Sequence, residues 1–190
     1  MTKFILLRHG QTDWNIQRLY QGQEDIPLND TGKRQAEEAA ETLKNVPIDI
    51  AYCSDLQRAV ETAKTVLRYH PSVPLMIDKR IRERSFGEYE GKPYQKDLMN
   101  PTDSNEINKK RDSLNFKFPQ GESLLDVYER ANSFYNDILQ KHPNETVLIV
   151  SHGTFLSILS AIIYQDELAE RKKYIFNNAE PVFIDPTEYN

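Results

Sequence analysis

Short continuous apolar runs alternate along this chain with longer segments in which apolar residues recur every three or four positions. The continuous runs are typical of strands buried on both faces, and they cover residues 4–7, 48–53, 74–77, 147–150 and 181–184. Three periodic segments predict amphipathic helices whose buried faces are Ala36, Ala39, Ala40 and Leu43; Leu56, Ala59, Ala63, Val66 and Leu67; and Leu124, Val127, Ala131, Phe134, Ile138 and Leu139. Residues 155–163 are mostly apolar and predict a further helix. This alternation indicates an α/β fold in three αβα layers around a mostly parallel central sheet.

Polar residues at the expected helix starts support this assignment of helices. Residues 30–32 resemble a helix start, Ser54 and Asp55 are candidate caps for the second helix, and Ser123 with Asp126 three residues later forms a cap signature for the third. Residues 92–120 are polar and weakly periodic, so we interpret them as a small cap inserted into a single domain spanning residues 1–190. The pattern leaves open whether this insertion is a surface excursion or a lid over a site.

Composition narrows the possible partners. The 190 residues contain 24 Lys and Arg against 29 Asp and Glu, a formal net charge of -5, which argues against a nucleic-acid partner that needs a broad basic face. One cysteine excludes an intrachain disulfide framework and is typical of a reducing compartment. The first apolar run is too short for a signal peptide or a membrane span. We therefore expect a soluble cytoplasmic protein with no membrane partner.

Two of the four histidines occupy equivalent places in the sequence. His9 follows the first apolar run and His152 follows the fourth, and each is followed by a glycine. Because ligands of open parallel sheets gather beyond the carboxyl ends of the strands, we expect both imidazoles to face one site if the two strands are neighbours. The glycines are expected to allow a sharp turn and to leave backbone N–H groups near the ligand. A lone histidine in such a place is usually structural, whereas two with Arg8 beside one of them favour catalysis.

Arg58 and Glu83 extend this set, although either could be an ordinary surface charge if it stood alone. Two arginines, two histidines and a carboxylate without metal-ligand spacing suit phosphoryl transfer. Guanidinium groups match the oxygens of a phosphoryl group, and an imidazole can attack phosphorus to form a covalent intermediate. A carboxylic acid can then protonate the departing oxygen and later activate water.

The motifs around these residues resemble those of the histidine phosphatase superfamily, in the branch that contains the phosphoglycerate mutases and related phosphatases. They span most of the chain in the family's order: Leu7-Arg8-His9-Gly10-Gln11-Thr12 with Asn15, Tyr20-Gln21-Gly22, Pro27-Leu28-Asn29 with Gly32, Gln35 and Ala36, Ser54-Asp55-Leu56 with Arg58, Ala59, Thr62 and Ala63, Arg82-Glu83, Phe86-Gly87, Glu90-Gly91, Gly121-Glu122-Ser123 and Ser151-His152-Gly153.

The resemblance implies a role for each matching residue. It makes His9 the phosphorylated nucleophile, with Arg8, Arg58 and His152 completing the phosphate pocket. It makes Glu83 the proton donor, ahead of Glu88 and Glu90. It also implies that the phosphate or the adjoining substrate is lined by Asn15, Gln21 and Gly22, and that no metal or other cofactor takes part. A protonated Glu83 would favour a somewhat acidic pH optimum, unless burial moves it toward neutrality.

Cys53 and the aromatic residues have simpler interpretations. Cys53 with Arg58 resembles the pair of the thiolate phosphatases, but the spacing is one residue short and the loop lacks glycine, so a buried structural cysteine is expected. Five aromatic residues could line the substrate wall or pack the cap against the core, and packing is favoured for at least half of them: Tyr20, Tyr89, Tyr94, Phe116 and Phe118.

The expected function is hydrolysis of a small phosphorylated metabolite. The alternative is a bisphosphoglycerate-dependent phosphoglycerate mutase, which needs a long cover and an arginine-rich insertion. Here the insertion offers Lys109, Lys110, Arg111 and Lys117 without a close match to the mutase signature, and this favours the phosphatase. A non-catalytic phospho-ligand binder is a second alternative, disfavoured because both His9 and Glu83 are present. The substrate and the oligomeric state are not indicated by the pattern.

Overall fold

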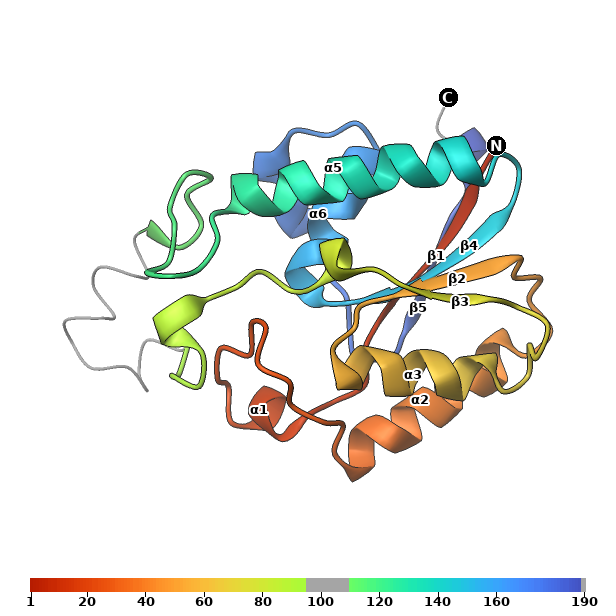
Figure 1. Ribbon diagram of the computed structural model, residues 1–190, viewed down its shortest axis with the longest axis horizontal. Coiled ribbons are helices and arrows are strands. Elements are labelled where there is room, and N and C mark those ends of the chain that lie inside the picture. The colour runs from red at the N-terminus through yellow and green to blue at the C-terminus, as the bar shows by residue number, and fades with distance from the viewer. Residues whose placement is uncertain (95–109, 189–190) are drawn as a thin grey trace.

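A central five-stranded sheet organises the protein (Figure 1). The computed structural model describes residues 1–94 and 110–188. The strands are β1 (Lys3–Arg8), β2 (Ile50–Cys53), β3 (Leu75–Ile77), β4 (Thr146–Ser151) and β5 (Pro181–Ile184). Their order across the sheet is β3-β2-β4-β1-β5, and β5 runs antiparallel to its neighbour β1 while the other pairs are parallel. The mostly parallel sheet expected from the apolar runs is confirmed.

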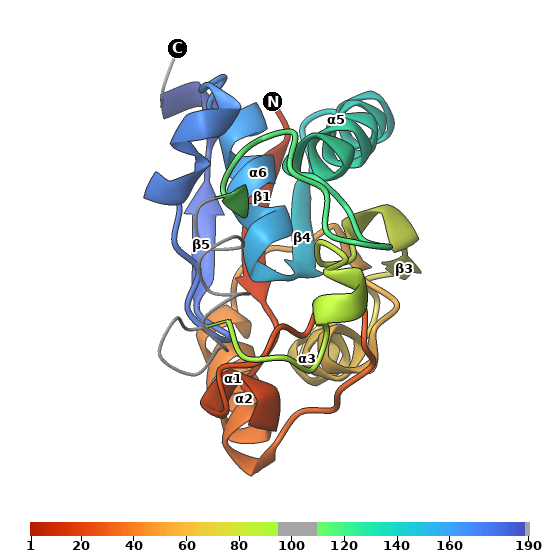
Figure 2. The same ribbon diagram turned by 90° about the vertical axis from the view of Figure 1, so that its left-hand side faces the viewer.

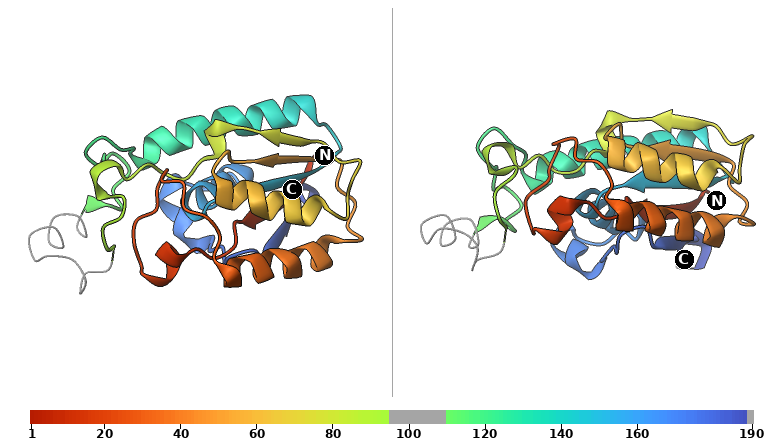
Figure 3. Two further views of the ribbon diagram at one scale, coloured as in Figure 1. Left: turned by 60° about the horizontal axis from the view of Figure 1, so that its bottom comes forward. Right: turned by 90° about the horizontal axis from the view of Figure 1, so that it is seen from below.

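Helices cover both faces of this sheet, as the views in Figure 1 and Figure 3 show. One face carries α2 (Asp30–Leu43) and α3 (Gln57–Leu67), and the other carries α5 (Leu124–Lys141) and α6 (Gly153–Ile163). The side chains of each central strand alternate between the two layers: Phe4 and Leu6 join the core under α5 and α6, whereas Ile5 and Leu7 join the core under α2 and α3. This confirms the three-layer αβα architecture.

The helix starts agree with the sequence in two places and differ in a third. Ser123 and Asp126 form a capping box at α5, and Asn29 caps α2 by accepting a hydrogen bond from the N–H of Gly32. The prediction that Ser54 or Asp55 caps α3 was wrong. The N-cap position of α3 is Leu56, which has no side-chain cap.

A residue from a distant loop binds the start of α3 instead. Asp25 Oδ1 accepts a hydrogen bond of 2.7 Å from the N–H of Gln57. The Asp55 carboxylate is bound by Arg82 at 2.5 and 2.6 Å. A partner 32 residues away in the sequence replaces the expected local cap.

Smaller differences concern element limits and one core residue. The polar segment after β1 contains a short helix, α1 (Asp13–Ile16), and short 3-10 helices are η1 (Lys79–Ile81), η2 (Gly87–Tyr89), η3 (Leu168–Lys173) and η4 (Pro186–Glu188). The second strand begins two residues later than expected, at Ile50, and α6 begins two residues earlier, at Gly153. Leu139, expected in the core, is 39% exposed.

The loops that follow the parallel strands gather at one end of the sheet, which faces the viewer in Figure 2. Most of the predicted insertion at residues 92–120 falls within residues 95–109 and so lies outside the described residues. Its role as a lid and the single-domain organisation stay predictions. Within residues 1–94 and 110–188, no helix is both long and apolar enough to cross a membrane.

Candidate active site

The strand register brings the two histidines together. β1 and β4 are neighbours, with Arg8 paired to Ser151, so His9 and His152 leave the sheet side by side. The N–H of His9 donates to the carbonyl of Ser151 at 3.0 Å, and the centroids of the two imidazole rings lie 5.1 Å apart. The two rings lie together as expected, although only His9 of the two lines the neighbouring cavity.

The His9 ring is held as a neutral nucleophile would need to be. It is 3% exposed, and its Nδ1 lies 2.7 Å from the carbonyl oxygen of Gly10. Because a carbonyl only accepts hydrogen bonds, Nδ1 carries the proton and the neutral ring keeps the lone pair of Nε2 free. Burial lowers the pKa of His9 well below its ordinary value, and the positive charges of Arg58 and Arg8 lower it further. The imidazole is therefore uncharged at neutral pH.

His152 precedes α6 and is fully buried. Neither of its ring nitrogens has a hydrogen-bond partner among the described residues. Burial is the largest cause that lowers the pKa of His152, and the positive charges of Arg58, Arg130 and Arg8 lower it further. A neutral ring with one unused N–H is thus placed beside His9.

Arg8 and Arg58 both present an unused N–H at this place. Arg58, on the first turn of α3, is fully buried and donates to the carbonyls of Gly22 at 2.8 Å and Glu24 at 2.7 Å. Arg8 donates to the carbonyl of Phe176 at 3.0 Å. In each guanidinium the Nε is buried without a partner in the described structure. Burial lowers the pKa of Arg58 to about 10, which leaves it charged at neutral pH.

A cavity of about 340 Å³ opens above these groups. Glu83 lines it together with His9, and the Glu83 carboxylate accepts hydrogen bonds from the N–H of Arg84 at 2.8 Å and of Thr154 at 3.2 Å. A Cβ added at Gly153 would lie 3.7 Å from Arg8 Nε and 3.9 Å from Glu83 Oε2, so the Glu83 carboxylate lies near the Arg8 guanidinium.

The other two candidate acids are directed elsewhere. Glu90 Oε1 accepts hydrogen bonds from the N–H groups of Gln23 and Phe86, each at 3.0 Å, and Glu88 is exposed and bound by Gln120. Neither lines the cavity. This geometry favours Glu83 over both alternatives.

The three expected substrate-contacting residues also line the cavity. Asn15 Oδ1 accepts from the N–H and Oγ1 of Thr12, so its amide NH₂ group is the end left for a ligand. Gln21 Oε1 is buried without a partner among the described residues. Gly22 has a φ of 50°, and a Cβ there would lie 2.0 Å from Glu90 Oε1, so this position requires glycine.

Gly10 does not act as expected. Its N–H donates to Thr62 Oγ1 at 3.1 Å and is not left for a ligand. A Cβ at Gly10 would lie 2.3 Å from the carbonyl oxygen of Gly32. The glycine is therefore required for close backbone approach to α2.

The aromatic residues form one packed cluster around Phe118, which is 1% exposed. Tyr20, Tyr94 and Phe118 also line the cavity, whereas Tyr89 and Phe116 only pack against the cluster. Both interpretations of this set therefore apply, to different members. Cys53 lies in the core under α2 and α3. Burial raises the pKa of its thiol to about 12, as expected for a structural cysteine.

Four charged residues lining the cavity were absent from the predicted site: Arg84, Arg111, Asp112 and Arg171. Arg84 carried a usable signal as the neighbour of Glu83, and Arg111 was one of the basic residues noted in the insertion. Arg171 comes from η3, far along the chain, and no pattern in the sequence linked it to the strand exits.

The unpartnered buried atoms mark the chemical character of the site. Six buried side-chain nitrogen and oxygen atoms lack a hydrogen-bond partner among the described residues, and five of them belong to Arg8, Gln21, Arg58 and His152. Three of these five atoms donate an N–H, namely the two arginine Nε atoms and one nitrogen of the neutral His152 ring, which suits a ligand with oxygen acceptors. In residues 1–94 and 110–188, no group of three or more His, Cys, Asp and Glu side chains could hold a metal ion.

Comparison with known proteins supports this picture. The family model described as "Histidine phosphatase superfamily (branch 1)" matches residues 4–190. The chain is 37% identical over 159 residues to "Uncharacterized phosphatase PhoE" of Bacillus subtilis, covering 84% of this chain and 76% of that protein. It is also 34% identical over 190 residues to "Probable phosphoglycerate mutase GpmB" of Cronobacter sakazakii, covering 93% and 82%.

A similar solved structure is that of mycobacterial glucosyl-3-phosphoglycerate phosphatase with VO3. It superposes with a TM-score of 0.86 at 26% identity and covers 96% of this chain and 90% of that one. The fold and the family thus agree with the geometry.

Proposed function

The chain belongs to branch 1 of the histidine phosphatase superfamily, and we propose that it hydrolyses monoesters of phosphate with small metabolites through a phosphohistidine on His9. One observation carries the proposal. A neutral imidazole with a free Nε2 lies among buried N–H groups that have no partner in the described protein. Because a buried donor without a partner costs about 1–3 kcal/mol, such a cluster is expected where a ligand supplies the acceptors.

In the first step, His9 Nε2 attacks phosphorus while the bond from phosphorus to the ester oxygen breaks. Arg8 and Arg58 neutralise the phosphoryl oxygens, and the neutral His152 donates a hydrogen bond to one of them. Glu83, in its protonated form, gives its proton to the departing oxygen. The products are the free alcohol, a phosphohistidine and the Glu83 carboxylate.

In the second step, the Glu83 carboxylate takes a proton from water as the water oxygen attacks phosphorus. The bond between His9 Nε2 and phosphorus breaks, inorganic phosphate leaves, and both side chains return to their starting states. No step in this scheme uses a metal or another cofactor. The localisation proposed from the sequence is the cytoplasm, and the proposed partner is a small phosphorylated metabolite.

The proposal is tested by measuring phosphate release from p-nitrophenyl phosphate without bisphosphoglycerate. Rapid quenching with ³²P-labelled substrate should give an acid-labile, alkali-stable label on the wild-type protein. His9→Ala should lose the label and reduce turnover by a factor of about 10³ or more. His142→Asn is the matched control, because His142 is bound to Tyr52 and Glu145 and does not line the cavity. A well-folded His9→Ala protein that keeps full activity would exclude the mechanism.

The mutase remains the second candidate, favoured by the similarity to a protein named as a probable phosphoglycerate mutase over 93% of this chain. It predicts isomerisation of 3-phosphoglycerate only after priming with bisphosphoglycerate. Phosphate release without a primer supports the phosphatase, and primer-dependent isomerisation alone supports the mutase.

A further inference from the structure

Arg130 of α5 binds the backbone of the segment that presents Glu83. Its guanidinium donates to three backbone carbonyls of this segment, those of Arg80 at 2.6 Å, Arg82 at 2.7 Å and Glu83 at 3.0 Å. The Arg130 side chain is 16% exposed and its guanidinium lies 5.5 Å from the centroid of the Phe155 ring. A planar fork with five donors can bind three carbonyls at once, which a lysine ammonium cannot do with the same geometry.

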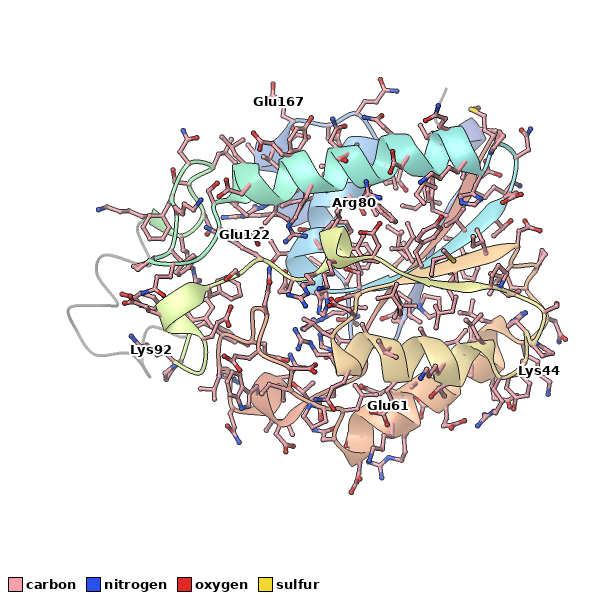
Figure 4. The ribbon with its side chains drawn as sticks, viewed as in Figure 1. Lys44, Glu61, Arg80, Lys92, Glu122 and Glu167 are labelled. Carbon is pink, nitrogen blue, oxygen red and sulfur yellow. The ribbon has the colours of Figure 1, made fainter. Side chains whose placement is uncertain are left out.

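Glu122 completes this arrangement from the loop before α5. Its carboxylate accepts from Arg130 Nε at 3.0 Å and from Arg130 Nη2 at 3.1 Å, and also from the N–H of Ser85 at 2.8 Å. The pair therefore contacts the chain on both sides of Glu83. In Figure 4 the labelled Glu122 lies between α5 and the segment that follows β3, which contains the labelled Arg80.

Among the described residues, the Glu83 carboxylate accepts hydrogen bonds from two backbone N–H groups, those of Arg84 and Thr154. Its position over the cavity thus depends on where its own backbone lies. Proton transfer needs heavy atoms about 2.6–3.2 Å apart, and a shift of about 1 Å can cost a factor of about 10² in rate.

We propose that Arg130, fixed by Glu122, is the positioning residue that places Glu83 for proton transfer to the leaving group. This rests on the proposed function, in which Glu83 is the acid. Arg130 touches no reacting atom and acts through the three carbonyls. Its loss would remove three of the hydrogen bonds that fix this backbone, alongside those from Ser151 to Ile81 and from Gln23 to Glu83, and would let Glu83 shift away from the ester oxygen.

Comparing substrates with different leaving groups distinguishes a positioning role from a general loss of structure. A nitrophenolate is a weak base and departs with little help, whereas the alkoxide of glycerol 3-phosphate needs a proton. The measurement is kcat/KM on p-nitrophenyl phosphate and on glycerol 3-phosphate, because kcat/KM covers only the steps through phosphorylation of His9. Glu83→Gln provides the reference for complete loss of the acid.

For Arg130→Lys we expect kcat/KM on glycerol 3-phosphate to fall by about 10–100-fold and on p-nitrophenyl phosphate by less than about threefold. Glu122→Gln should lower the ratio of kcat/KM on glycerol 3-phosphate to kcat/KM on p-nitrophenyl phosphate as well, but by a smaller factor. This variant replaces Arg130→Lys in the test if Arg130→Lys does not fold. Arg80→Gln is the matched control. Arg80 also ties the same segment to α5, through Asp137 and Ser133, but its side chain makes no contact with the Glu83 backbone. Its ratio should equal that of the wild type.

A ratio that stays at the wild-type value in both Arg130→Lys and Glu122→Gln, or that shifts equally in Arg80→Gln, would overturn the inference. If Glu83→Gln shifts the ratio and the Arg130 and Glu122 variants do not, the positioning role fails and the proposed function stands. If Glu83→Gln leaves the ratio unchanged, the acid assignment fails, and the positioning role fails with it.

Discussion

The two ends of the active-site cavity contain equally buried arginines that are used in different ways. We call the part of the cavity lined by Arg8, His9 and Arg58 the inner end and the part lined by Arg84, Arg111 and Arg171 the outer end. Arg58 is fully buried and Arg84 is 3% exposed. Arg58 and Arg8 each keep a buried Nε without a partner in the described residues. Arg84 instead donates to three carbonyls, those of Glu122, Arg111 and Phe116, at 2.8–2.9 Å.

The other outer arginines are also bound by the protein. Arg111 donates to the carbonyl of Tyr94 at 2.8 Å, and Arg171 forms an ion pair of 3.5 Å with Asp112. Both ends thus contain buried arginines, and the unused donors at the inner end distinguish the two. A buried cation that binds backbone carbonyls stabilises loops, whereas one that keeps free N–H groups is available to a ligand.

Replacing one arginine from each end with methionine tests most directly whether the inner arginines bind a ligand and the outer arginines stabilise loops. Arg8→Met should lower kcat/KM on p-nitrophenyl phosphate by about 10²–10³, because it removes a donor to the transferring phosphoryl group. The midpoint of urea unfolding should change little, since only the bond to the Phe176 carbonyl is lost. A loss of less than about tenfold would show that Arg8 does not bind the phosphoryl group.

Arg84→Met should have the opposite profile. It leaves three carbonyls without their donor, and we expect the free energy of unfolding to fall by about 2–4 kcal/mol. The kcat/KM of the protein that remains folded should fall by less than about tenfold. Both quantities come from urea unfolding and from assays at a temperature where the variant is folded. A stable but inactive Arg84→Met protein would place Arg84 with the inner group.

The inner end also predicts a pH dependence. Burial, Arg58 and Arg8 lower the folded-state pKa of His9 below its ordinary value of 6.5, so we expect NMR titration to show a neutral His9 ring at pH 6.5. The unfolded chain then binds more protons than the folded protein below pH 6.5. The stability contributed by this group is full above that pH and is lost as pH falls from 6.5 toward the folded pKa.

Arg8→Met should raise the His9 pKa, because it removes one of the two neighbouring cations. A His9 ring that is already protonated at pH 6.5 in the wild type would contradict the assignment of a neutral nucleophile.

Arg171→Gln is expected to give the smallest effect. Arg171 is paired with Asp112 and lies at the outer end, so kcat/KM on p-nitrophenyl phosphate should change by less than about threefold. Lys172→Gln, which removes the exposed partner of the same carboxylate, is the control. A loss as large as that of Arg8→Met would erase the distinction between the two ends.

Much of the fold followed from local pattern. Apolar runs of strand length and apolar stripes of helical period predicted the five strands and four long helices. This works because the spacing of apolar residues within one segment shows which of its faces are buried. The same locality placed His9 and His152 at strand exits. Their motifs also predicted Arg58, Glu83, Asn15, Gln21 and Gly22, all of which line the cavity with His9.

Contacts between distant segments were decided only by the tertiary structure. The start of α3 is bound by Asp25, and Arg58 is held by the carbonyl of Gly22, 36 residues away. Glu83 is favoured over Glu90 because the N–H of Gln23 binds the Glu90 carboxylate. The hydrogen bond from Arg130 to the Glu83 carbonyl joins residues 47 positions apart. The spacing of apolar and polar residues shows which side of its own helix or strand a residue occupies. Its partners on other elements depend on how the helices pack against the sheet, and no repeating pattern along the sequence encodes those contacts.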